Sequence, residues 1–173
     1  MFAIVQNGNI VQFIQPNVGF TIGEKQYSAR FIQNSTEAER KAVGVYEIIY
    51  GQQQDQRFYW VDGPNYRVNE TNQTVEATFN ATPKALEDNL ETKGLKSQWI
   101  AQTKQTAGLM LAQTDWTVIR KAERNVDIPA SVVTKRAAIV AECDRLEAAI
   151  TGADSVEALM AVLNAQGWPN DNL

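Results

Sequence analysis

The side chains that most often carry enzyme chemistry are nearly missing from this chain. Its 173 residues include no histidine and a single cysteine, Cys143. Imidazole is the usual proton carrier near neutral pH, so Ser-His-Asp and Cys-His catalysis are excluded within the chain. Zinc sites built from imidazoles or from several thiolates are excluded for the same reason. Cys143 occupies one position of an apolar pattern with helical spacing. This predicts that its side chain is a small buried hydrophobic group and not a reactive thiol.

Carboxylates and phosphate-binding loops are the remaining candidates for chemistry, and neither forms a motif. Glu87 and Asp88 are adjacent in a predicted helix, where neighbouring side chains point apart. A glycosidase needs two opposed carboxylates, and no motif in the sequence indicates such a pair. The chain contains no G-x-x-x-x-G-K-[ST], G-x-G-x-x-G or G-x-S-x-G sequence. We therefore expect that the protein is not an enzyme and that it uses no cofactor or metal ion.

The charge of the chain is mildly negative and evenly spread. Lys and Arg number 16 against 20 Asp and Glu, and division at Thr82 leaves each half with a small acidic excess. Nucleic-acid binding needs a basic surface that replaces counterions, so we expect no nucleic-acid partner. The apolar run at the start ends at Asn7, far short of a signal peptide, and no run reaches transmembrane length. These features predict folding in a cytoplasm, without a membrane.

Tyr59 and Trp60 lie in the densest group of aromatic residues in the chain. The other members are on neighbouring predicted strands: Phe58, Tyr46, Tyr50 and Tyr66. Rings of this kind often line sugar-binding sites. Because side chains alternate along a strand, however, one set of rings would fill a small β core, and we favour that interpretation. A carbohydrate-binding surface that includes Tyr59 and Trp60 is the alternative.

The first 81 residues predict an antiparallel β-rich module. Asn7-Gly8 between two apolar runs is typical of a hairpin, because both residues accept the positive φ of a type I′ turn. A short helix is expected after a Thr36–Glu39 capping box and before Gly44. The sequence at 62–65, Asp-Gly-Pro-Asn, is expected to end a strand. Beyond the first hairpin, strands are predicted at residues 20–22, 27–32, 45–50, 58–61, 66–68 and 74–79.

From Thr82 onward the pattern is helical. Thr82 at a cap and Pro83 at the first helical position predict the start of a long helix, with Gly94 as its weak point. Its apolar residues recur at helical spacing: Leu86, Leu90, Leu95, Trp99, Ile100, Ala107, Met110 and Leu111. Pro129 predicts the start of another helix, whose apolar stripe is Val132, Ile139, Cys143, Leu146 and Ile150.

We expect this second stripe to pack against the first helix, although its near-heptad spacing leaves self-association open. Gly152 is expected to end the helix, and Asp154 with Glu157 forms a capping-box pattern for a last short one. Together these patterns predict an α+β chain with a β-rich module at residues 1–81 and a helical module at residues 82–173.

Residues 111–117 read Leu-Ala-Gln-Thr-Asp-Trp-Thr. This segment, centred on Thr114, Asp115 and Trp116, resembles the L-x-x-T-D-W-T segment of phage tail assembly chaperones, small proteins that accompany tail fibre genes. In that family a proline-containing connector follows, then an arginine on a second helix, and often a Trp-Pro near the end. Comparable places in this chain are occupied by Pro129, Arg136 and Trp168. The residues themselves suggest folding roles: Asp115 would cap the following helix and Trp116 would lock two helices as a buried ring.

The resemblance implies a tail fibre assembly chaperone or a fibre-associated tail protein that binds the phage tail fibre. Other tail or baseplate proteins are further candidate partners, and a homo-oligomer is compatible with this role. The implied location is the host cytoplasm during assembly, or the virion tail if the protein stays with the fibre. The alternative is a structural virion component, namely a baseplate, fibre-anchoring or fibre-tip receptor-binding protein.

Overall fold

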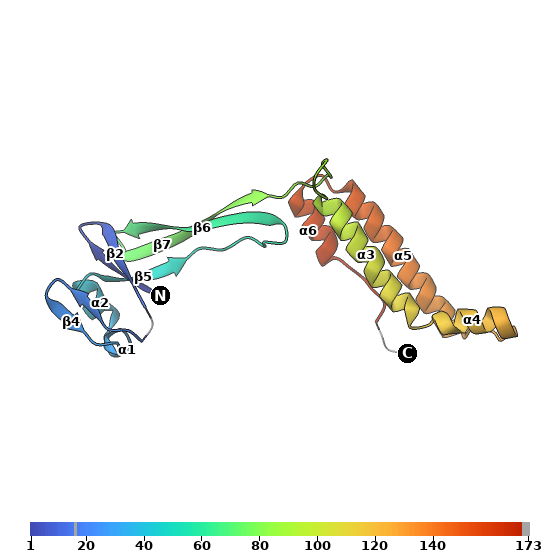
Figure 1. Cartoon of the computed structure of the whole chain (residues 1–173), viewed down its shortest axis with the longest axis horizontal. Coiled ribbons are helices and arrows are strands. Elements are labelled where there is room, and N and C mark those ends of the chain that lie inside the picture. Colours follow the sequence, from blue (N-terminus) through green and yellow to red (C-terminus); the bar gives the residue numbers. More distant parts are fainter. Residues whose placement is uncertain (16, 171–173) are drawn as a thin grey trace. The chain divides into compact units, whose positions relative to one another are not determined.

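The computed structural model of the chain describes residues 1–15 and 17–170. Strands occupy the first half and helices the second, so the predicted α+β class is confirmed (Figure 1). Contacts between residues divide the chain into two compact units, Met1–Thr82 and Pro83–Leu173. Each unit has its own core, as a small domain requires.

A five-stranded sheet forms the body of the first unit. Its strand order is β2-β1-β5-β7-β6, so β2 and β6 are the edges. β1 runs antiparallel to β2 and β5, whereas β5 and β7 run parallel. The sheet is therefore mixed and not wholly antiparallel as expected, because β6 carries the chain back before β7 pairs with β5. The strands are β1 (Phe2–Gln6), β2 (Asn9–Ile14), β5 (Val45–Tyr50), β6 (Tyr59–Asn69) and β7 (Thr74–Pro83).

The predicted hairpin at the start of the chain is confirmed. Asn7 and Gly8 join β1 to β2, and their φ angles are 51° and 75°. Positive φ at both positions is the requirement of a type I′ turn, whose twist matches that of the flanking strands. Asn9 also donates its side-chain amide to the carbonyl of Asn7 at 3.0 Å.

Four short elements lie between β2 and β5 in the sequence. The Thr36–Glu39 capping box forms as predicted: the Thr36 hydroxyl accepts the N–H of Glu39, and the Glu39 carboxylate accepts the N–H of Thr36. Gly44 follows the helix with a φ of 79°. The elements are β3 (Phe20–Ile22), β4 (Lys25–Tyr27), α1 (Phe31–Asn34) and α2 (Glu37–Ala42).

The strand predicted at 27–32 is wrong beyond Tyr27, because the chain turns into α1 instead. The Ser35 hydroxyl donates to the carbonyl of Phe31, at the first residue of α1. The guanidinium of Arg40 donates to the carbonyls of Ile32 and Ser35. These side-chain bonds satisfy carbonyls that a strand would have paired with a neighbour.

β6 continues through Gly63 and Pro64, where the sequence predicted an end. A proline lacks the N–H that a central strand needs, but β6 is an edge strand, where that donor is not required. Gly63 has a φ of 116°, and a side chain there would approach the carbonyl oxygen of Thr78 to 3.0 Å. Glycine is therefore required where β6 bends.

Both faces of the sheet carry apolar cores. Val75 and Ala77 of β7 are fully buried, which confirms the predicted alternation of inward and outward residues in that strand. Their cluster is completed by Ala3, Val5, Tyr46 and Ile48. On the opposite face, Ile4, Ile14 and Val45 form a core with Phe20 of β3, against which Tyr27 and Phe31 pack.

The described residues of the second unit form four helices. α3 and α5 lie side by side, and α6 packs against α5 (Figure 1). Pro129 directly precedes α5 and Gly152 is its last residue, as predicted. Among the described residues no helix is both long and apolar enough to cross a membrane. The helices are α3 (Leu95–Ala112), α4 (Asp115–Arg124), α5 (Ala130–Gly152) and α6 (Val156–Asn164).

The predicted start of the first helix at Pro83 is wrong. β7 continues through Pro83, and α3 begins only at Leu95. In the loop between them the Asn89 side chain accepts two backbone N–H groups, and the Asp88 carboxylate accepts the N–H of Gly94 at 2.7 Å. Such side-chain acceptors compete with the hydrogen bonds of a helix, which explains the late start.

The apolar stripe of α5 is internal, as expected. Ile139, Leu146 and Ile150 are fully buried, and α5 packs along α3. The predicted Asp154–Glu157 capping box does not form. Instead the hydroxyl of Ser155 caps α6 by accepting the N–H of Ala158 at 3.1 Å, because Ser155 has the extended backbone that a cap requires.

Candidate functional site

Arg136 of α5 ties the end of α3 to the start of α4. Its Nη1 atom lies 2.8 Å from the carbonyl oxygen of Leu111, 2.8 Å from Oγ1 of Thr114 and 2.9 Å from Oδ1 of Asp115. Nη1 carries two hydrogens, so the three acceptors share them. The structure thus brings Thr114, Asp115 and Arg136 together, although Arg136 is 21 positions from Asp115.

The charges at this junction suit the helix ends that they contact. The Leu111 carbonyl belongs to the last turn of α3, where the helix dipole favours a cation such as Arg136. Asp115 is the first residue of α4, where the dipole favours an anion. The cluster therefore fixes the turn between two helices.

The predicted capping role of Asp115 is wrong. The cap position of α4 is Thr114, and its side chain does not accept a backbone N–H of the first turn. Its hydroxyl donates to the Leu111 carbonyl at 3.1 Å. The Asp115 carboxylate binds Arg136 instead, since a hydrogen bond between two charged groups is stronger than one to a neutral amide.

Trp116 is not the buried ring that the sequence predicted. It is 57% exposed, and the guanidinium of Arg120 lies 5.0 Å from the ring centroid. Thr117 takes the inward position: it is 1% exposed, and its hydroxyl donates to the Thr114 carbonyl at 2.7 Å. Neighbouring residues of a helix point in different directions, so the preceding residue, Trp116, faces away from the core that buries Thr117.

As a result α4 presents its apolar side to solvent. We call Trp116, Val118, Ile119 and Ala122 the outer face of α4; all four are exposed. Figure 1 shows α4 beyond the end of the α3–α5 pair. The spacing of Trp116 and Ile119 is visible in the sequence, but it also fits a face that packs inward. The sequence analysis therefore missed this surface.

Two other predicted residues lie apart from the Arg136 junction. Pro129 occupies the cap position of α5, about 10 Å along the helix axis from Arg136 at 1.5 Å per residue. Trp168 follows α6, and its indole N–H donates to the Gln166 side chain at 3.0 Å. Neither contributes to the cluster of Thr114, Asp115 and Arg136.

The segment that contains Trp168 is anchored to α5 through Glu142. The Glu142 carboxylate accepts the N–H of Gly167 at 2.7 Å and two bonds from Arg145, each also 2.7 Å. Arg145 donates in turn to the carbonyl of Ala165 at 3.1 Å. The bonds from Arg145, and then that from Gly167, hold the pKa of Glu142 below its ordinary value. The contact between Glu142 and Gly167 was not expected from the sequence, because the two residues are 25 positions apart.

Cys143, next to this anchor, is a half-buried thiol. Burial, and then the nearby carboxylates of Asp144 and Glu147, raise its pKa. A raised pKa keeps the sulfur in the thiol form, which is a poor nucleophile. These features fit the packing role that the sequence predicted.

The aromatic group of the first unit does not form one surface. Tyr59 is buried at 8% exposure, together with Tyr46 and Phe58, whereas Trp60 is 64% exposed, together with Tyr50 and Tyr66. The expectation of a β core is thus met by half of the rings. Desolvation, and then a hydrogen bond with Tyr50, raises the pKa of Tyr66.

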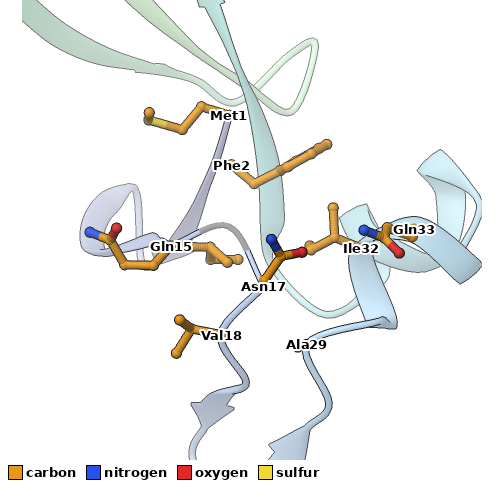
Figure 2. A pocket seen from close by; sticks show the side chains of 9 residues that line it. Met1, Phe2, Gln15, Asn17, Val18, Ala29, Ile32 and Gln33 are labelled. Carbon is orange, nitrogen blue, oxygen red and sulfur yellow. The ribbon is translucent and has the colours of Figure 1, made fainter.

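An apolar pocket of about 220 Å³ opens in the first unit. Figure 2 shows Phe2, Asn17 and Ile32 lining it from three different segments. Its polar lining groups are the side-chain amides of Asn17, Gln15 and Gln33. Such a lining can hold an uncharged apolar group, and none of the described side chains that line the pocket is a nucleophile or an acid.

Metal binding finds no support in the described part of the chain, where no three Cys, Asp or Glu side chains are grouped as ligands. The chain matches no protein-family model, no curated protein and no solved structure.

Proposed function

We propose that this protein is a non-catalytic tail fibre assembly chaperone or fibre-associated tail protein that binds the phage tail fibre. The observation that carries the proposal is the contact of Arg136 with Thr114 and Asp115. Thr114 and Asp115 belong to the segment that resembles the chaperone family, and Arg136 occupies the place of the arginine on that family's second helix. Contact among the three residues supports the resemblance. A shared sequence motif is more informative when its members meet in space.

A chaperone for a fibre needs a surface that holds apolar segments until the fibre has assembled. Long β-rich fibres expose unpaired strand edges and apolar side chains while they assemble, and these aggregate. The second unit offers exposed apolar side chains on a helix whose position is fixed by the Arg136 junction. Arg136 would act as a positioning residue, since it lies behind the outer face of α4 and does not belong to it.

Co-expression with the tail fibre protein of the same phage tests the proposal. We expect the soluble fraction of the fibre to rise when this chain is present, and to fall towards the level of fibre alone with Arg136→Ala. Arg67→Ala is the matched control, because it removes an exposed arginine from β6 in the other unit. A fibre that stays as insoluble with the wild-type chain as without it would refute the proposed chaperone role.

A structural role in the virion is the second candidate, and the two-unit organisation favours it. Two compact units joined near Thr82 suit an adaptor with one unit for each partner. Quantitative mass spectrometry of purified particles separates the two roles. A fixed copy number per tail supports a structural protein, whereas absence from particles and abundance in the lysate supports a chaperone that leaves after assembly.

A further inference from the structure

We propose that the outer edge of β7 at residues 78–82 is a strand-binding site, which pairs with a short extended segment of the tail fibre. In this mode of binding a segment of one protein adds a strand to a sheet of another, and the backbone groups of the two chains bind each other. The choice of the fibre as partner rests on the proposed function, whereas the open edge is a property of this chain alone.

β7 continues past the strand that covers its edge. It pairs with β5 only at residues 74–77, and β5 ends at Tyr50, whereas β7 runs on to Pro83 (Figure 1). On that side the N–H of Gly51 donates to the carbonyl of Ala77 at 2.8 Å. Among the described residues, no backbone hydrogen bond from the chain after Gly51 continues this pairing towards residues 78–82.

The backbone groups of Phe79 and Ala81 point to the open side. The N–H and C=O of one strand residue point to the same neighbouring strand, and the direction alternates from each residue to the next. Ala77 bonds on the β5 side. Thr78 faces β6, since its carbonyl oxygen would lie 3.0 Å from a Cβ atom added at Gly63. By this alternation Phe79 and Ala81 present two N–H and two C=O groups outward.

The open edge lacks the features that commonly prevent strand pairing, which are charged side chains, prolines and bulges. β6, an edge strand of the same sheet, has two of them: Asp62 is exposed and charged, and Pro64 has no N–H. Residues 78–82 of β7 read Thr-Phe-Asn-Ala-Thr, without a charge or a proline. Such an edge is a template for another strand.

The chemistry of the edge requires an extended polypeptide segment as its partner. Donors and acceptors that recur at every second residue match those of another strand. A helix has no free backbone groups along its length, and a lipid surface offers no such series of donors and acceptors. A β-rich fibre exposes unpaired strands while it assembles, and these would fit the edge.

A second copy of this chain fits the edge less well. In a two-fold antiparallel pair, Phe79 of one copy can lie opposite Ala81 of the other. That register sets Pro83 of each copy opposite Ala77, where Gly51 already binds. A register that sets the two Ala81 residues opposite each other brings Phe79 against Pro83, which has no N–H to donate. We therefore assign the edge to a segment of another protein.

Hydrogen exchange of the full chain tests the site, because the outward amides report on it directly. In the free chain we expect the amides of Phe79 and Ala81 to exchange at least about tenfold faster than that of Thr78, which faces β6. Saturation with the tail fibre protein of the same phage should slow both outward amides about tenfold. The capped peptide acetyl-Thr-Val-Thr-Val-Thr-amide, at about 1–5 mM, should have the same effect, since its affinity is expected to be weak.

A substitution at Ala81 tests the hydrogen bonds. Ala81→Pro removes one outward donor and should weaken binding of the fibre and of the peptide by about tenfold. Ala81→Val is the matched control, because it keeps the N–H and valine suits a strand, and it should bind within about twofold of the wild type. Equal exchange rates of the β5 amides in both variants would show that the sheet is intact. The exchange pattern of the wild type needs no variant and remains decisive if Ala81→Pro fails to fold.

Three results would overturn the proposal: slow exchange of Phe79 and Ala81 in the free chain, equal binding by Ala81→Pro and the wild type, or slowing that appears when the chain alone is concentrated. The last result would assign the edge to a second copy. A fibre that this chain keeps soluble, without slower exchange at either residue, would refute the strand-binding site and leave the proposed function standing. Slower exchange with the peptide, together with a fibre that stays insoluble, would refute the proposed function and support the strand-binding site.

Discussion

The rings of Phe13 and Tyr66 lie 4.7 Å apart between centroids, with their planes tilted by 50°. Phe13 belongs to β2 and Tyr66 to β6, the two edge strands of one five-stranded sheet. Edges of a flat sheet with three strands between them would be nearly 20 Å apart at about 4.8 Å per strand. The contact therefore means that the sheet curls until its edges meet, and that the rings cover the meeting point.

We expect this contact to stabilise the first unit. Phe13→Ala or Tyr66→Ala should lower its free energy of unfolding by about 1–2 kcal/mol, through lost ring contact and a partly filled gap. Hydrogen exchange of the β2 and β6 amides measures the loss in this unit alone. Val11→Ala, at an exposed position of the same strand, is the control and should change little. Equal protection in Phe13→Ala and wild type would show that the curl does not need the rings.

Gly94 is the strictest sequence requirement of the second unit. A Cβ atom there would lie 2.3 Å from the backbone carbon of Glu87 and 2.4 Å from the Leu86 carbonyl oxygen. Gly94→Ala should therefore cost about 2–4 kcal/mol or more, because backbone must move. Gly108→Ala is the matched control: it lies within α3 with open space around it, and it should stabilise by about 0.5–1 kcal/mol. Urea denaturation of both variants measures their free energies of unfolding, which should change in opposite directions.

The anchor at Glu142 should make stability depend on pH. Because the pKa of Glu142 is lowered in the folded state, the unfolded chain binds this proton more readily. The contribution is present above the ordinary value of 4.5 and is lost as the pH falls through the lowered pKa. Glu142→Gln should thus reduce Tm by about 2–4 °C near neutral pH, and the difference should vanish in acid. Thermal melts across this range measure it; a constant difference would indicate that the carboxylate charge is not involved.

Cys143 should react slowly in the folded protein. Its raised pKa and partial burial predict alkylation by iodoacetamide about tenfold slower or more than that of a free thiol at the same pH. In denaturant the rate should rise to the ordinary value. Mass spectrometry over time follows the reaction, and rapid labelling of the native chain would show that the thiol is accessible after all.

Local chemistry determined a large share of this fold from the sequence alone. Asn7-Gly8 accepts positive φ, and Thr36 with Glu39 satisfies the N–H groups of a helix start; both depend on residues within one turn. The stripe of Ile139, Leu146 and Ile150 needs only a period of 3.6 to predict a buried helix face.

Tertiary structure alone decided the features that join distant residues. Pro64 lies inside a strand because β6 is at the edge of its sheet, and no local pattern reveals an edge. The sequence predicted a buried Trp116, but Thr117 is the buried residue of α4, and Trp116 and Ile119 are exposed. Arg136 was expected on its helix, yet its three acceptors were set by how α5 lies against the α3–α4 turn. A sequence shows the spacing of apolar residues and the turn-forming residues directly. Which face of a helix or strand is buried, in contrast, depends on contacts between segments far apart in the chain.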